Sequence, residues 1–531
     1  MANIPGIPVY KDIGATPAPI PTPDSPTDTA PVVIVGAGPV GLAMALDLGR
    51  RGHEVVVLNR LDFIAHASKA ICFSKRSLDI LDRLGVGDPA VEKGVTWNVG
   101  KVFWRDGGEP VYQFDMLPVK DQKRPGFINI QQYYIEEFLL DGVEKLPNVE
   151  IRWGHRVEDV TPRNDGVELA VIADEGGAYK LRAEWLIACD GSRSTVRDKL
   201  GLDFEGRVFE DNFLIADIRM KHEMPSERWF WFDPPFNPGR SALMHKQPDD
   251  VWRLDFQLGW DVDRKAAIQP ENVEPFVRAM LGPDVEFERE WYSVYTFQCR
   301  RMARFVHGRV VFAGDSAHLV SPFGARGCNG GFADVDNLGW KLDLVLRGEA
   351  GAGLIETYNE EAIATADENI LNSTRSTDFL TPKSPASQAL RDAVLELARD
   401  HAFARPIVNS GRLSTAVHYP ASPLSTPDAD GWANGVAPGA PVLDAPHGDG
   451  WLLEAIGDEF VVLARGWTGR VPAAVRLIEV DGLAADRLGL GDGGACLIRP
   501  DHYVAARWKT PDPAAIDAAL AHAKGGKQWL N

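Results

Sequence analysis

The residues best suited to chemistry lie in one stretch near the middle of the chain, residues 309–346. It begins RVVFAGDSAH, and the short apolar run Val310–Ala313 is typical of a buried strand bounded by turn residues. Asp315 follows Gly314 directly, at the carboxyl end of that strand, where α/β sheets place ligand-binding groups. The pattern therefore predicts a carboxylate presented at a ligand site.

A glycine-rich loop follows this strand and leads into a helix. The loop reads LVSPFGARGCNGG, and its proline and glycines disfavour regular structure and let the backbone approach a ligand closely. Apolar residues then recur at helical spacing, namely Phe332, Val335, Leu338, Leu342 and Val345. Because a helix N-terminus attracts negative charge, the junction of loop and helix predicts a site for an anionic group.

A second candidate site lies near the start of the chain. The strand Val32–Val35 runs into GAGPVG (residues 36–41), which opens a helix, and a second strand follows at Val55–Leu58. In such a βαβ unit the glycines permit a tight turn and close approach of a pyrophosphate to the helix N-terminus. A lone GxGxxG is weak evidence, but this strand–turn–helix–strand context predicts dinucleotide binding.

A third motif lies between these two sites. The apolar run Leu186–Cys189 ends in Asp190-Gly191, and SRSTVR opens a helix. The spacing D-G-x-x-S-x-x-R combines a turn with hydroxyl and basic side chains at a helix start. Taken alone, it also fits an ordinary strand-to-helix turn.

Together the three motifs resemble those of class A flavoprotein monooxygenases, the single-component aromatic hydroxylases of the p-hydroxybenzoate and phenol hydroxylase type. Pro322-Phe323-Gly324 and NLGWKL (residues 337–342) carry the same resemblance. It implies an enzyme that binds FAD, uses NAD(P)H as co-substrate, and hydroxylates a small phenolic compound with O₂ through a flavin C4a-hydroperoxide. In that family the aspartate of the Gly-Asp pair holds the ribityl chain, and the Asp-Gly motif serves both FAD and NAD(P)H.

The resemblance also assigns cofactor-binding positions, and two of them depart from the family. Asn59 stands where the family usually has Glu or Asp, so its contact lacks charge assistance. Lys69 stands where Arg is common, and lysine cannot form the bidentate fork. Gln132 fits by spacing, although a helix-cap amide is an equal alternative. The assigned residues are Gly36, Gly38, Pro39, Gly41, Asn59, Lys69, Gln132, Asp190, Gly314, Asp315, Pro322, Gly327, Cys328 and Asn329.

The stretch 209–298 predicts a sheet that roofs an aromatic pocket, with walls from Trp229–Phe232. Apolar and polar residues alternate over residues 252–258, which is typical of a half-buried strand. By resemblance to benzoate hydroxylases, His245 can face the phenolic oxygen and Arg253 an acidic or nitro group, yet each can equally be a solvated sheet residue. The candidate catalytic residues are His245, Arg253, Asp255, Tyr295 and Pro322. Phenol hydroxylases carry an Asp where this chain has Ile71, so that base is absent.

We therefore expect an α/β protein with a Rossmann-like FAD-binding domain, a β-sheet substrate domain and a thioredoxin-like C-terminal domain. The ending LIRPDHYVAARW resembles the thioredoxin-like tail of phenol hydroxylases, but without CxxC a packing or dimerisation role is favoured over a redox role. The expected divisions are a disordered Pro-rich arm (1–30), the FAD-binding domain (31–208 and 299–421, with 96–125 contributing to the substrate domain), the substrate sheet (209–298), a linker (422–450) and the C-terminal domain (451–531).

Composition narrows the remaining possibilities. The net charge of −19 argues against nucleic-acid and anionic-membrane surfaces, and there is no apolar run of about eighteen residues. Five scattered cysteines without a CxxC pair favour a reduced cytoplasm and no metal site. We expect a homodimer. Two alternatives stay open: a flavoprotein oxygenase of another type (epoxidation or Baeyer–Villiger), or a non-catalytic flavin- or ligand-binding protein.

Overall fold

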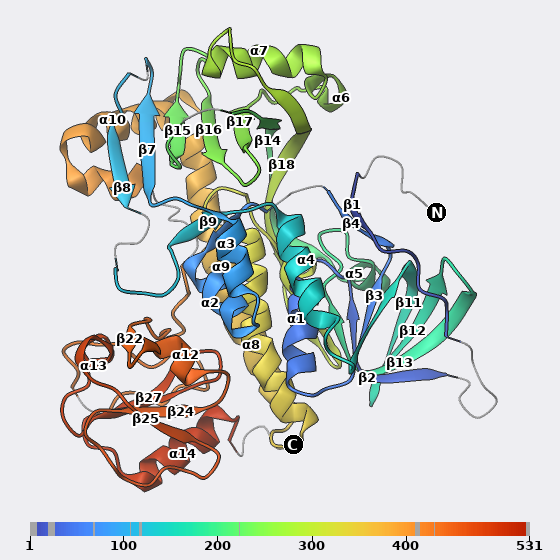
Figure 1. The fold of residues 1–531 in the computed structure, drawn as a ribbon, viewed down its shortest axis with the longest axis vertical. Helices are drawn as coiled ribbons and strands as arrows, with labels where there is room; N and C mark the ends of the chain where they lie inside the picture. The colour runs from blue at the N-terminus through green and yellow to red at the C-terminus, as the bar shows by residue number, and fades with distance from the viewer. Residues whose placement is uncertain are drawn as a thin grey trace.

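The computed structural model describes most of the chain, and its elements are shown in Figure 1. The described residues are 8–19, 27–66, 70–106, 108–115, 119–221, 224–408, 415–429 and 431–526. Within them the largest sheets are two of eight strands and one of four. Helices alternate with parallel strands along the part of the chain that forms the first large sheet. The expected α/β class is therefore confirmed.

The first sheet is mixed, and its parallel part contains the βαβ unit predicted around the glycine motif. Strand β2 (Asp28–Val35) pairs in parallel with β3 (Val55–Asn59) and β13 (Gly177–Ala188), and β13 pairs in parallel with β20 (Val310–Phe312). Because these strands run the same way, the three motifs that follow β2, β13 and β20 emerge at one edge of the sheet. The strand residues from Val32 to Ile34 are wholly buried, as continuous apolar runs in parallel sheets predict.

Helix α8 (Gly327–Leu346) runs through the middle of the molecule, beside α1 (Pro39–Arg50) and α9 (Leu354–Leu380) (Figure 1). It is the helix predicted from the apolar spacing. Its buried residues lie on all sides and include charged ones. The helix therefore contacts several parts of the protein at once.

The second sheet contains the predicted substrate strands, in the order β21-β18-β14-β17-β16-β15-β7-β8. Strands β7 and β8 come from the 96–125 stretch. The bounds are β7 (Val99–Trp104), β8 (Tyr112–Asp115), β14 (Phe204–Arg219), β15 (Arg228–Phe232), β16 (Ser241–Lys246), β17 (Val251–Gln257), β18 (Glu288–Met302) and β21 (His318–Leu319).

The two faces of this sheet have different neighbours. One face packs on α7 (Pro270–Leu281) and includes Trp231 together with the half-buried Trp229. The other face includes Phe230 and Phe232 and packs on α10 (Pro385–Asp400) and the loop residue Phe323. Alternation along β15 therefore corrects the prediction that all four residues wall one pocket: only the two phenylalanines share the face that meets the loop before α8.

Residues 8–19 of the N-terminal arm are ordered, in contrast to the poorly ordered segment that the proline content predicted. Residues Val9–Asp12 form β1, which pairs antiparallel with β4 (Phe63–Ala65). The ring of Tyr10 stacks on Tyr133 with centroids 4.3 Å apart, and its hydroxyl donates to Glu137 at 2.6 Å. Residues 8–19 are thus held by aromatic and polar contacts that composition does not reveal.

The C-terminal unit contains the four-stranded sheet, in the order β25-β24-β26-β27. Its elements are α12 (Leu452–Ile456), β24 (Val461–Ala464), β25 (Arg476–Glu479), α13 (Gly482–Leu488), β26 (Ala495–Ile498), β27 (Val504–Trp508) and α14 (Pro513–Ala523). Phe460 and Leu497 of this unit share an apolar cluster with Trp340 and Leu344 of α8.

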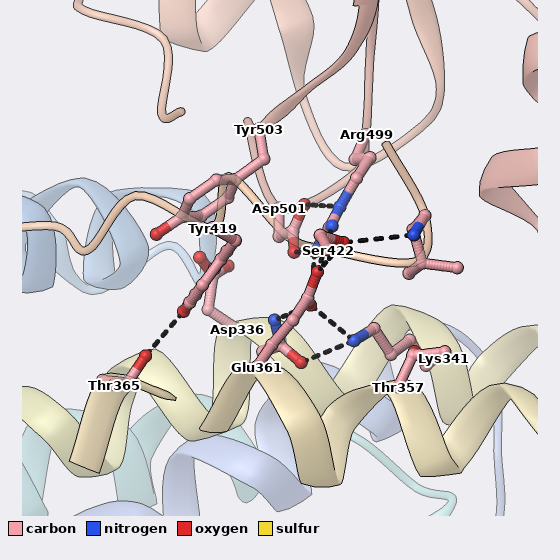
Figure 2. A network of polar contacts seen from close by, with 12 residues as sticks. Asp336, Lys341, Thr357, Glu361, Thr365, Tyr419, Ser422, Arg499, Asp501 and Tyr503 are labelled. Atoms are coloured by element: carbon pink, nitrogen blue, oxygen red, sulfur yellow. Dashed lines mark hydrogen bonds and ion pairs between the residues drawn. The ribbon is translucent and has the colours of Figure 1, made fainter. Parts of the chain in front are cut away.

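A buried ionic network also joins this unit to the helices (Figure 2). Arg499 donates to both carboxylate oxygens of Glu361 on α9, at 2.6 and 2.9 Å, and pairs with Asp501. Lys341 of α8 donates to Glu361 at 2.7 Å. These side chains are 0–2% exposed. The segment Arg499–Asp501 of the C-terminal motif thus provides the ionic contact between this unit and helices α8 and α9.

The charges around Glu361 also determine its ionisation. Burial alone raises the pKa of a carboxyl, but the cations of Arg499 and Lys341 outweigh burial and hold the pKa of Glu361 below its ordinary value. A carboxyl with a lowered folded-state pKa stabilises the fold above its unfolded-state pKa. That stability is lost as the pH falls through the folded-state value.

No helix among the described residues is long and apolar enough to cross a membrane. In the same residues, no group of three or more His, Cys, Asp or Glu side chains is placed to hold a metal ion.

The first prediction concerns this network. Arg499→Ala leaves two buried carboxylates short of a cation, and breaking a buried pair in this way costs about 3–5 kcal/mol of unfolding free energy. Chemical denaturation measures the loss. Arg470→Ala removes an exposed partner of Asp517 and is the control, with an expected change below about 0.5 kcal/mol. Equal stabilities for the two variants contradict the role of the network.

Candidate cofactor and substrate site

The glycine turn after β2 is tightly packed on its inner side and open on its outer side. A Cβ at Gly41 would lie 1.9 Å from the carbonyl oxygen of Gly36, and one at Gly36 would lie 2.5 Å from that of Cys189. A Cβ at Gly38, which caps α1, would meet no atom within 4 Å. Pro39 opens the helix without needing a hydrogen-bond acceptor. This cradle at a helix N-terminus fits a pyrophosphate.

Asn59 ends β3 beside this turn and has two backbone partners. Its Oδ1 accepts from the Ala37 N–H at 3.1 Å, and its Nδ2 donates to the Leu61 carbonyl at 3.0 Å. The amide thus fastens the glycine turn to the end of β3. A carboxylate can reproduce the first contact but not the second, which gives the departure from the family a structural reason.

A buried pair, Asp334 and His318, holds the Gly-Asp turn after β20 in place. The Gly314 N–H donates to Asp334 of α8 at 2.8 Å, and the same carboxylate oxygen lies 2.7 Å from His318 Nε2. Burial lowers the pKa of His318, but the Asp334 charge outweighs it and raises that pKa above its ordinary value. The pair leaves Asp315 itself exposed at the sheet edge, on a turn that cannot shift freely.

The Asp-Gly motif is tied to the Gly-Asp turn. Arg197, the last residue of the motif, donates to the Ser316 carbonyl at 3.0 Å and to the Ser192 carbonyl at 2.9 Å. Asp190 accepts from the Val196 N–H at 3.2 Å, while its other oxygen is buried without a hydrogen-bond partner among the described residues. Burial raises the pKa of Asp190. The third motif therefore adjoins the other two and presents an unsatisfied acceptor.

The N-terminus of α8 completes this edge. Asn329 accepts from the Ser74 N–H at 3.0 Å and donates to the Cys72 carbonyl at 3.0 Å, so it anchors β5 (Cys72–Ser74) to the helix. Burial, followed by the Asp315 charge, raises the pKa of Cys328 well above its ordinary value, which keeps the thiol protonated. Gly327 is half-buried and opens the helix.

Two further predicted residues lie around this helix start. Pro322 is exposed in the loop before α8, where its carbonyl accepts from the Ala325 N–H at 3.0 Å. Gln132 accepts from the Ala70 N–H at 3.1 Å and donates to Glu136 at 2.8 Å. Its amide therefore fixes the segment before β5. Lys69 lies outside the described residues.

Tyr295 of β18 lies near the Gly-Asp turn. Burial, and then the negative charge of Asp315, raise the pKa of Tyr295 to about 12. Its ring lies 5.6 Å from that of Phe297, and part of the residue stays exposed. Tyr295 thus offers a protonated hydroxyl close to the predicted ribityl position.

Of the three polar candidates on the substrate sheet, His245 and Arg253 are buried and Asp255 is half-buried, on the face toward β5. Arg253 donates to both oxygens of Asp217 at 2.7 Å, and both side chains are 4% exposed. This guanidinium is thus already paired within the sheet, and its role as the substrate's anion partner stays a prediction. The partner sits on the adjacent strand β14, in register with Arg253.

His245 and Asp255 form a second pair on that face. His245 Nε2 lies 3.3 Å from the Asp255 carboxylate, and Nδ1 lies 3.9 Å from the Cys72 sulfur. Burial lowers the pKa of His245 to about 4, so the imidazole is neutral at physiological pH. A neutral, buried imidazole near the helix start can accept a hydrogen bond from a phenol, and the Asp255 charge beside it favours transfer of the proton.

Sequence reasoning missed Arg228 on β15, which donates to the Cys72 sulfur at 3.7 Å. The segment RWFWF carried the signal: strict alternation puts Arg228 on the same face as Phe230 and Phe232. It also missed His318 and Asp334, although the histidine stands in the quoted GDSAH.

Comparisons with known proteins agree with this geometry. Residues 29–373 match the family described as "FAD binding domain". The chain is 31% identical over 369 residues to the 3-(3-hydroxy-phenyl)propionate/3-hydroxycinnamic acid hydroxylase of Escherichia coli (strain SMS-3-5 / SECEC), which covers 68% of this chain and 64% of that relative. The chain thus spans just under two thirds of the relative's length.

Two solved structures are also similar. The p-nitrophenol 4-monooxygenase from Pseudomonas putida DLL-E4 has 27% identity and a TM-score of 0.65, over 73% of this chain and 100% of that one. The anhydrotetracycline hydroxylase from Streptomyces rimosus has 27% identity and a TM-score of 0.72, over 93% and 99%. Because it covers 93% of this chain, the second likeness extends into the C-terminal unit.

The site yields a prediction for cofactor retention. If Asp315 holds the ribityl chain, as the resemblance implies, Asp315→Ala removes a charge-assisted hydrogen bond of about 1.5–3 kcal/mol, and the dissociation constant of FAD should rise about 10- to 100-fold. Flavin fluorescence titration of the apoprotein measures it. Asp165→Ala, in the exposed turn between the strands His155–Arg163 and Gly166–Ala173, is the control. An unchanged dissociation constant in a folded Asp315→Ala protein contradicts the placement of the ribityl chain.

Proposed function

The chain belongs to the FAD-binding-domain family, and on this premise we propose that it is a flavin-dependent monooxygenase that hydroxylates a small phenolic compound with NAD(P)H and O₂. The observation that carries the proposal is the meeting of three motifs at one sheet edge. Arg197 joins the Asp-Gly turn to the Gly-Asp turn there, and the glycine cradle packs against Cys189 at the start of the Asp-Gly turn, beside the N-terminus of α8.

The electrons and oxygen atoms that the reaction consumes determine which groups the protein must bind. FAD, when bound, supplies the redox chemistry: NAD(P)H provides two electrons, one oxygen atom enters the ring as a hydroxyl, and the other leaves as water. The chain's own groups hold the cofactor and orient the ring. Gly36–Gly41 and the N-terminus of α1 are suited to bind the pyrophosphate, and Asp315 is suited to bind the ribityl chain. The N-terminus of α8 is suited to the end of the flavin that gathers negative charge.

The substrate lies, in this proposal, between the loop before α8 and the inner face of the second sheet. Phe230, Phe232 and Phe323 supply apolar walls. A phenolate attacks an electrophile better than a phenol, so a proton acceptor at the ring oxygen accelerates the reaction. The neutral His245 is our candidate for that acceptor, with Asp255 placed to stabilise the imidazolium.

We propose a structural role for the C-terminal unit. Its strand order, with β24 parallel to β25 and antiparallel to β26, supports the thioredoxin-like interpretation. Cys496 is buried, and burial raises the pKa of its thiol to about 12, which disfavours the reactive thiolate. The ion pairs of Arg499 instead make the unit a support for α8 and α9. A homodimer and a cytoplasmic location stay predictions, and sedimentation tests the first.

A direct assay tests the proposed function. We expect the purified protein to be yellow, with about one FAD per chain, and to oxidise NADH or NADPH faster when phenols, phenolic acids or nitrophenols are added. Mass spectrometry should find a product that has gained one oxygen. A ring-expanded product or an epoxide, or no stimulation across the panel, excludes phenolic hydroxylation. No stimulation in a protein that binds FAD tightly favours a binding protein.

The role of His245 gives a prediction with a pH signature. His245→Ala should lower the hydroxylation rate by about 10²–10⁴-fold while FAD stays bound. The folded-state pKa of about 4 lies below the ordinary histidine value, so the imidazole is neutral above it and loses acceptor capacity only as the pH falls through it. The acid limb of kcat/KM attributable to His245 should therefore lie near pH 4. A limb near the ordinary histidine pKa, abolished in the variant, contradicts the burial argument.

A further inference from the structure

Strand β4 lies outside both large sheets, and its only strand partner among the described residues is β1 of the N-terminal arm (Figure 1). Backbone hydrogen bonds extend this pairing at both ends. The N–H groups of Ile13 and Gly14 donate to the Asp62 carbonyl at 3.1 and 2.9 Å, and the His66 N–H donates to the Pro8 carbonyl at 2.8 Å. Because an isolated pair of short strands is marginally stable, β4 depends on the arm for its position.

The segment that the arm holds begins at the glycine cradle. Asn59 binds the Ala37 N–H in the glycine turn and the Leu61 carbonyl, and the next residue, Asp62, is already bonded to the arm. The chain from Asn59 to His66 thus runs without a break from the cradle to the arm. In a dinucleotide-binding βαβ unit the end of the second strand lies beside the adenosine ribose, so this segment borders the cofactor.

The arm is itself anchored to parts of the FAD-binding fold that do not include β4. Tyr10 stacks on Tyr133 of helix α4 (Gln132–Val143). Further along the arm, the Thr16 N–H donates to the Trp153 carbonyl at 2.9 Å, and the Thr16 hydroxyl oxygen accepts from the Trp153 N–H at 3.1 Å. Trp153 ends the strand that pairs with β3 in the first large sheet. The arm therefore connects β4 to a helix and a sheet that stand without it.

Tyr133 also contacts the far end of the held segment. The His66 ring stacks on Tyr133 with centroids 4.9 Å apart, and His66 Nε2 lies 3.5 Å from the Glu290 carboxylate of β18. Tyr133 is 5% exposed, so its ring is a buried support. One buried ring thus contacts both the arm, through Tyr10, and the end of the segment, where that end meets the substrate sheet.

We propose that residues 8–19 form a strap that holds the segment Asn59–His66 beside bound FAD, with Tyr10 as its positioning residue, and that this strap sets the rate at which FAD is released. The inference rests on the proposed function, because FAD is the ligand that the segment borders. The family match covers residues 29–373, so the strap lies outside it. The large sheet fixes the glycine turn, whereas the arm alone pairs with β4. Release of a bound dinucleotide needs a bordering segment to move, and the arm restrains this one.

The experiment measures FAD release from the full-length, FAD-loaded protein, as the rise of flavin fluorescence after rapid dilution. Tyr10→Ala removes the stacked ring, and Tyr10→Phe keeps the ring but removes its hydroxyl. A double variant, Val9→Cys with Ala65→Cys, places two thiols opposite each other across β1 and β4. Directly opposed residues of an antiparallel pair have the separation that a disulfide requires. Phe403→Ala removes an exposed ring outside the arm and is the control.

We expect Tyr10→Ala to speed FAD release about 2- to 10-fold, which is the factor that corresponds to one aromatic pair. Tyr10→Phe should release FAD at a rate between those of the wild type and Tyr10→Ala. The oxidised double-cysteine protein should release FAD more slowly than its reduced form, since the disulfide joins β1 to β4 covalently. Phe403→Ala should match the wild type.

The denaturation midpoint of the FAD-free protein separates the strap from a purely structural role. A lower midpoint for Tyr10→Ala with an unchanged release rate overturns the inference, and so does equal release by the oxidised and reduced forms of the double-cysteine protein. If Tyr10→Ala does not fold, the comparison of those two forms decides alone. FAD binding and phenol hydroxylation by the wild type, with unchanged release in the variants, refute only this inference. A wild type that binds no FAD refutes the proposed function as well.

Discussion

Helix α8 is buried along nearly its whole length, and every polar side chain on it must therefore find a partner inside the protein. Each of those partners belongs to a different part of the chain. Asn329 binds β5, Asp334 holds the Gly-Asp turn and His318, and Asp336 pairs with Arg76 and Arg83 of α2 (Lys75–Arg83). Further along, Lys341 binds Glu361 of α9, and Asp343 pairs with His53 after α1. The requirement to satisfy one helix thus fixes the relative positions of the surrounding elements.

This constraint links stability to the site. Buried ion pairs add little net stability, because desolvation offsets much of their attraction, but losing one partner is costly. They consequently act as positioning contacts. The Asp334 carboxylate fixes the position of the Gly-Asp turn relative to the start of α8. Asn329 fixes the distance between β5 and the start of α8. A dinucleotide that spans the glycine cradle and that helix start needs both spacings fixed before it binds, which lowers the conformational cost of binding.

The parts of the fold that were predictable are those determined locally. Apolar runs ending in glycine turns identified β2, β13 and β20, because buried parallel strands and tight turns each need particular neighbouring residues. Side-chain partners were not predictable in the same way. Arg253 meets Asp217 only through the register of β14 against β17, and Asn59 meets Ala37 only once β3 lies beside β2. The pairing of β1 with β4 likewise depends on Tyr133, far along the chain.

The two groups of buried charges follow opposite rules, and the contrast carries functional meaning. On α8 every charge is paired within the chain, as expected where the role is to hold elements together. On the inner face of the second sheet Arg253 follows that rule and Arg228 does not. Natural sequences violate polar satisfaction chiefly at functional sites, where a ligand supplies the missing partner. Arg253 lies in register with Asp217 on β14, whereas Arg228 lies in register with His245 on β16 and Gly100 on β7. Only the presence or absence of a carboxylate on the adjoining strand separates the two.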